Sequence, residues 1–145
     1  MAGRWEGSTV VDRPIEEVFR FLADGENDRK FSPRVQEIRK TTEGPPGVGT
    51  VYASTVKDAG MTTKRENAIT EFAPPTRIRW AERSKNLVTS PMGGYDLMPE
   101  GADATRLTMW GEFEGHGAGK LLAPLALRTS RKGAGDFLAS IKRAI

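Results

Sequence analysis

Few side chains in this sequence are obvious candidates for chemistry. It contains no cysteine and one histidine, which excludes thiolate chemistry and any metal site built from several histidines. The single histidine, His116, stands between glycines, and no G-x-S-x-G motif provides a nucleophile for it. The 19 Asp and Glu residues show no spacing that specifies an acid/base pair. We therefore assign no catalytic residue, metal or cofactor, and favour a non-enzymatic role while leaving an enzyme open.

The charge of the chain is close to balanced. Lys and Arg number 22 against 19 Asp and Glu, and the net charge of +3 is too small to indicate a nucleic-acid partner. The C-terminal segment is locally basic, since one acidic residue, Asp136, accompanies Lys120, Arg128, Arg131, Lys132, Lys142 and Arg143. Such a segment can contact an anionic membrane transiently, or can simply be a solvated helix face. We expect no nucleic-acid partner and keep membrane contact as a candidate.

The N-terminal part predicts one strand followed by two short helices. Residues 4–11 end in β-branched side chains, which favour a strand. Pro14 suits the first position of a helix, and apolar residues then recur at helical intervals until Gly25, which is expected to end it. Residues 26–31 are expected to form a further helical turn before Pro33 returns the chain to an extended conformation.

Short strands separated by turns are expected over residues 35–113. Around Ile78 and Trp80, apolar and polar residues alternate as in a half-buried antiparallel strand. The connections are too short for the crossovers that parallel strands require. After the glycine-rich residues 115–119, the period becomes helical as far as Ile145. This order of elements predicts an α+β fold in which a curved antiparallel sheet wraps around the last helix.

Five segments in order are similar to one known family. They resemble segments of the polyketide cyclase/dehydrase and START-like (SRPBCC) superfamily. The five segments are Arg13–Asp24, Gly47–Thr50, Glu71–Ile78, Ala104–Thr108 and Leu121–Leu125. The resemblance implies a single domain over the whole chain, 1–145, with the helix-grip fold of birch pollen allergen. It also implies a cavity between the sheet and the long helix, used for lipids, polyketides or other apolar molecules. Binders and enzymes both occur in this family, so the fold alone does not decide between them.

The inward-facing apolar residues can line such a cavity or fill the core. Trp80 and Tyr95 would add polar atoms to an apolar wall. Gly133 would leave volume unfilled, or would let the helix pack closely on the sheet. The resemblance implies that Phe31 lies at the mouth of this cavity, at a corner where many members of the family carry Trp. The candidate ligand-binding residues are Phe31, Asn67, Ile78, Trp80, Tyr95, Leu97, Leu107, Met109, Leu122, Leu125, Gly133 and Phe137.

The strand expected over residues 61–72 does not reveal its inward face, because polar residues occur on both sides. A bulge would bring Ile69 and Phe72 to the same face. Asn67 is our candidate for a polar contact with a ligand. The alternative is that this row is a solvated outer surface or pairs with neighbouring strands.

The sequence as a whole predicts a protein that binds a small, mainly apolar molecule, as a carrier or sensor. The alternative is a polyketide cyclase or dehydratase that uses a polar residue of the same cavity. No apolar run approaches the ~20 residues needed to span a bilayer, and no signal peptide is evident, so we expect a cytoplasmic protein. The sequence indicates neither the identity of the ligand nor the oligomeric state.

Overall fold

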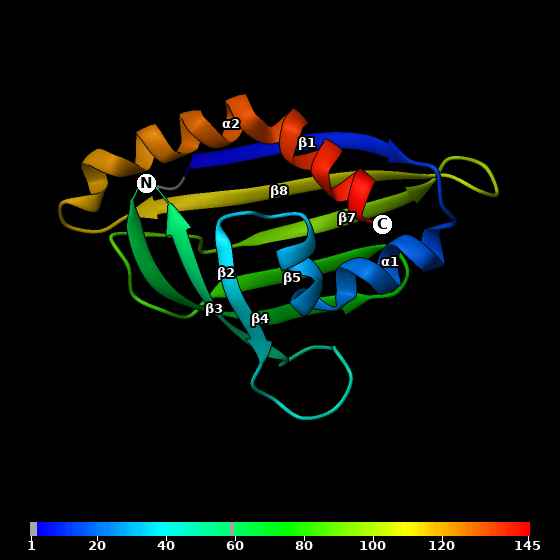
Figure 1. Ribbon diagram of the computed structural model, residues 1–145, viewed down its shortest axis with the longest axis horizontal. Helices are drawn as coiled ribbons and strands as arrows, with labels where there is room; N and C mark the ends of the chain where they lie inside the picture. The colour runs from blue at the N-terminus through cyan, green and yellow to red at the C-terminus, as the bar shows by residue number, and fades with distance from the viewer. Residues whose placement is uncertain (1–2, 59) are drawn as a thin grey trace.

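A curved antiparallel sheet lies against one long helix (Figure 1). The computed structural model describes residues 3–58 and 60–145. The elements are β1 (Gly3–Val11), α1 (Ile15–Ala23), the 3-10 helix η1 (Gly25–Lys30), β2 (Val35–Lys40), β3 (Val51–Asp58), β4 (Met61–Ala73), β5 (Arg77–Glu82), β6 (Val88–Thr89), β7 (Gly93–Pro99), β8 (Thr105–Gly115) and α2 (Gly119–Ala144). The strands pair in the order β1-β8-β7-β5-β4-β3-β2, and β6 pairs with β8 outside this series. The expected α+β helix-grip fold, with two short helices after the first strand, is confirmed.

The two short helices form a corner between β1 and β2. α1 buries Val18 and Leu22, whose spacing places them on one face of the helix. The side chain of Asp24 then accepts a hydrogen bond from the Glu26 amide at 3.1 Å, which caps the start of η1. The corner ends at Phe31, a buried aromatic residue that follows a polar segment.

The C-terminal half of α2 packs on the sheet next to β1 and β8. Its buried side chains Ala134, Leu138 and Ile141 recur at three- and four-residue intervals. They approach β1 closely because that strand carries Gly7, where a Cβ would lie 2.5 Å from Leu138 Cδ1. A larger residue at this position would push the helix away from the sheet.

The N-terminal half of α2 presents its leucines to solvent. Leu122 and Leu125 are 41% and 62% exposed, so the expectation that they face the cavity is wrong. At about 100° per residue, both lie nearly opposite the buried stripe that contains Leu138. Apolar residues occur on several sides of this helix, and periodicity alone did not identify the side that packs.

Candidate functional site

A cavity of about 170 Å³, which we call the first cavity, lies between the concave side of the sheet, the α1–η1 corner and α2. An apolar cavity of roughly 150 Å³ holds a benzene molecule, so this volume suits a ligand with a single ring. Seven residues predicted from the sequence line it: Phe31, Asn67, Ile78, Trp80, Tyr95, Met109 and Phe137.

A second cavity, of about 210 Å³, adjoins the first. Ser32, Val35, Met109 and Phe137 border both volumes. Gly133 lines the second cavity, and a Cβ at this position would meet no atom within 4 Å. Of the two alternatives expected for this glycine, the structure therefore shows open volume rather than close packing.

Aromatic rings form much of the wall of the first cavity. Trp80 and Tyr95 pack edge to face with ring centroids 5.0 Å apart, and Phe31 meets Phe137 at 5.8 Å. The indole has room because Gly93 lies beside it, where a Cβ would stand 2.6 Å from Trp80 Nε1. The alternation of apolar and polar residues in β5 thus predicted the inward side of Trp80 correctly.

Asp28, a carboxylic acid that our sequence analysis did not single out, also lines the first cavity. A 3-10 helix has three residues per turn, so Gly25, Asp28 and Phe31 lie on one face of the corner, and all three line the cavity. Burial raises the pKa of Asp28 to about 7, and the nearby carboxylate of Asp24 acts in the same direction. At neutral pH the Asp28 side chain is therefore divided between its charged and neutral forms.

Two tyrosines provide further polar groups in the wall. Burial raises the pKa of Tyr95 well above its ordinary value, and the negative charge of Asp28 contributes. The Tyr52 hydroxyl donates to the Ala23 carbonyl at 3.3 Å, and burial raises its pKa as well. Both hydroxyls therefore remain protonated at neutral pH.

The inward face of β4, which the sequence left open, carries Asn67 and Ile69. The pairing of β4 with β5 shifts its register between Ile69 and Glu71. Phe72 can then also point inward, and its ring packs edge to face against Phe19 with centroids 5.2 Å apart. The bulge considered from the sequence is therefore confirmed.

Two predicted residues, Leu97 and Leu107, are buried but border neither cavity. They belong to the packed core, together with Val18 and Leu22 of α1. Their expected position in the cavity wall is thus corrected, because both side chains pack in the core that β7 and β8 form with α1 and α2.

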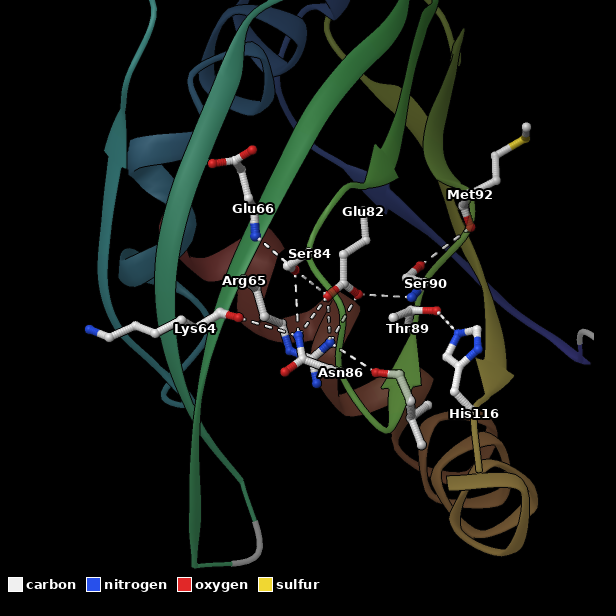
Figure 2. A network of polar contacts seen from close by, with 11 residues as sticks. Lys64, Arg65, Glu66, Glu82, Ser84, Asn86, Thr89, Ser90, Met92 and His116 are labelled. Atoms are coloured by element: carbon white, nitrogen blue, oxygen red, sulfur yellow. Dashed lines mark hydrogen bonds and ion pairs between the residues drawn. The ribbon is translucent and has the colours of Figure 1, made fainter. Parts of the chain in front are cut away.

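An ion pair between Arg65 and the buried carboxylate of Glu82 continues the inward rows of β4 and β5 beyond the first cavity. Figure 2 shows this pair and its polar neighbours. Arg65 Nη1 donates to Glu82 at 2.9 Å, and the Glu82 side chain is only 1% exposed. The Ser84 hydroxyl, the Asn86 amide and the Ser90 backbone N–H donate to the same carboxylate at 2.6, 3.0 and 2.9 Å. This network connects the ends of β4 and β5 to the loop that carries β6. Within it, the positive charge of Arg65 is paired with Glu82.

His116 borders neither cavity. Its Nε2 atom lies 2.8 Å from Thr89 Oγ1, on an exposed surface where β6 pairs with β8. Within residues 3–58 and 60–145, no group of three or more His, Asp or Glu side chains is arranged to hold a metal ion. The acid/base capacity at the first cavity therefore comes from Asp28 and the tyrosines.

Solved structures of low sequence identity share this fold. TTHA0849 from Thermus thermophilus is 17% identical, with a TM-score of 0.80 over 98% of this chain and 96% of that one. The Zhui aromatase/cyclase from Streptomyces sp. R1128 is 17% identical, with a TM-score of 0.79 over 99% and 94%. A START superfamily protein from Mycobacterium smegmatis is 16% identical, with a TM-score of 0.74 over 97% and 92%. At these identities the likeness shows the fold alone.

Sequence comparison identifies the family. No curated protein matches the chain. The family model described as polyketide cyclase/dehydrase and lipid transport matches residues 3–145. This match agrees with the resemblance of the five segments and with the helix-grip fold. The chain therefore belongs to the polyketide cyclase/dehydrase and lipid transport family.

Proposed function

We propose that the protein binds a small, mainly apolar organic molecule in the first cavity and acts as a carrier or sensor of it. The observation that carries this proposal is the aromatic-walled hollow itself, with a carboxyl group and tyrosines among its lining residues. Apolar walls with a few polar groups are typical of small-molecule sites. Membership of a family described by lipid transport gives further support.

The residues proposed to contact the ligand come from both cavities. We add Asp28 to the residues predicted from the sequence, because η1 places it in the cavity wall. We remove Leu97, Leu107, Leu122 and Leu125, because they border neither cavity. The proposed ligand-contacting residues are Asp28, Phe31, Asn67, Ile78, Trp80, Tyr95, Met109, Gly133 and Phe137.

Replacing Gly133 by Leu tests whether the first and second cavities bind a ligand. The new side chain would extend into the second cavity, so a three-ring apolar probe that needs both volumes loses space. We expect saturable binding of N-phenyl-1-naphthylamine to the wild type, and binding at least about tenfold weaker to Gly133→Leu. Titration followed by probe fluorescence measures both affinities.

Gly135→Leu is the matched control for this experiment. Gly135 also lies in α2 with no atom within 4 Å of an added Cβ, yet it borders neither cavity. Both substitutions should stabilise the helix by up to about 1 kcal/mol, and only the change at Gly133 should weaken probe binding. No saturable binding by the folded wild type, or equal affinities of the two variants, would contradict the proposal.

A second candidate function is catalysis in the same cavity, as a cyclase or dehydratase. The observation that favours it is Asp28, since a half-buried carboxyl group in the cavity wall with a pKa of about 7 can accept and return a proton at neutral pH. In that case Asp28→Asn would abolish turnover of a polyketide-like substrate while leaving probe binding intact. A carrier would bind such a molecule and return it unchanged.

The N-terminal half of α2 supports a finer proposal, transient contact with an anionic membrane. Leu121 is 84% exposed, and Leu125 lies one turn further along the same side. The nearby basic side chains Lys120, Arg128 and Lys132 are exposed, and none takes part in an ion pair with the described residues. No helix in the described part of the chain is long and apolar enough to cross a membrane. Exposed leucines beside unpaired basic residues instead suit a helix lying on an anionic surface.

Replacing Leu121 by Glu should reduce co-sedimentation with phosphatidylserine-containing vesicles by about fivefold, because it removes apolar area and adds a repelled charge. Binding to vesicles of phosphatidylcholine alone should be weak for every variant. Met98→Glu is the control, since Met98 is 62% exposed but lies on β7, outside α2. The membrane proposal would be overturned if Leu121→Glu and Met98→Glu reduced vesicle co-sedimentation equally, or if the wild type did not bind vesicles.

A further inference from the structure

The first cavity has one carboxyl group in its wall, and the described residues place no basic side chain beside it there. Among its described lining residues, Asp28 is the charged one, and none is Lys or Arg. Arg65 extends the inward row of β4, but it donates to Glu82 instead. The Asp24 carboxylate adds to the negative potential at Asp28. A half-buried carboxylate in these surroundings is stabilised by a positive charge placed next to it.

The rest of the wall is suited to an organic cation. Phe31, Tyr52, Trp80, Tyr95 and Phe137 all contribute aromatic rings. The face of an aromatic ring attracts a cation through its quadrupole, and the attraction increases where water is excluded. A carboxylate surrounded by aromatic rings therefore matches an ammonium group attached to an apolar body.

We infer that the ligand of the first cavity is an apolar amine, whose protonated nitrogen donates to the Asp28 carboxylate while its hydrocarbon body contacts the aromatic wall. This inference rests on the proposed function, because it specifies the class of molecule bound at the same site. A carboxylate on the ligand would be repelled by Asp28, and a hydroxyl would leave the charge uncompensated. An amine alone among these groups neutralises it.

The test compares three molecules of similar size, 2-phenylethylamine, 2-phenylethanol and ethylbenzene, titrated into the wild type at pH 8 with tryptophan fluorescence as the readout. At this pH Asp28 is ionised, while Tyr52 and Tyr95 remain neutral. We expect the amine to bind at least about tenfold more tightly than the alcohol. In Asp28→Asn this preference for the amine over the alcohol should fall to within about twofold.

Glu26→Gln provides the matched control, since it removes a carboxylate of η1 that does not line the cavity. Its preference for the amine should equal that of the wild type. If the wild type binds ethylbenzene but shows no preference for the amine, the inference is overturned and the proposed function stands. If Glu26→Gln loses the preference as fully as Asp28→Asn, general surface charge explains it and the inference also fails. If none of the three molecules binds saturably, both fail.

Discussion

Replacing Glu82 by Gln is expected to lower the free energy of unfolding by about 3 kcal/mol. The Glu82 carboxylate is almost fully buried and accepts hydrogen bonds from Arg65, Ser84, Asn86 and the Ser90 amide. An amide of the same shape leaves the Arg65 charge uncompensated and turns an NH₂ group toward donors. Urea unfolding at neutral pH, followed by tryptophan fluorescence, measures the change.

Glu66→Gln is the control for the Glu82 prediction. Glu66 also forms an ion pair with an arginine, Arg83, at 3.6 Å, but the Glu66 side chain is 44% exposed. Exposed pairs contribute little, so the loss should stay below about 0.5 kcal/mol. Equal losses for the two variants would show that the network around Glu82 does not hold β4 and β5 to the neighbouring loop.

Asp28→Asn is expected to stabilise the protein at pH 8 by about 2 kcal/mol and to have little effect at pH 4. Burial raises the pKa of Asp28 from 3.8 to about 7, so between these values the folded state holds a proton that the unfolded state has released. Stability from this group therefore falls as the pH rises through this range, and the loss is complete above pH 7. Asn has no proton to lose. The expected gain in stability is below the ~4 kcal/mol that a change of pKa from 3.8 to about 7 would give, because a cavity-facing carboxylate keeps some solvation.

The pH dependence should be measured as the difference between variant and wild type in urea unfolding at pH 4 and pH 8. The matched control is Asp103→Asn, which removes an exposed carboxylate of the β7–β8 turn and should change stability equally little at both pH values. If the difference in free energy of unfolding between Asp28→Asn and the wild type is the same at pH 4 and pH 8, Asp28 is solvated.

Local patterns in the sequence predicted most of the fold. The alternation around Ile78 and Trp80 identified an inward face because one side of that strand is buried and the other is not. The pair Ile69 and Phe72 indicated a bulge, because no regular strand puts both on one side. The side of α2 that packs depended on Gly7, a distant residue that admits the helix, and no local pattern contains that information.

The polar part of the site was missed for a similar reason. Asp28 lies in the polar segment of η1, whose composition is typical of an exposed turn. The available signal was its spacing of three residues from Phe31, which a 3-10 helix places on the same side. Trp110 is the opposite case, an apolar residue that is buried although it does not face the cavity side of the sheet. It is buried on the outer face of β8 because the guanidinium groups of Arg4 and Arg79 stack over its ring at 4.1 and 5.0 Å.

The most direct measurement of ligand binding in the hollow is an NMR titration of the protein with ¹³C-methyl-labelled methionine and ethylbenzene as ligand. Met109 lines both cavities, whereas Met61, Met92 and Met98 are exposed on the outside. We predict a saturable shift of the Met109 methyl signal while the signals of the three exposed methionines stay in place. Shifts of the exposed methionine signals with an unmoved Met109 signal would contradict binding in the cavities between the sheet and α2.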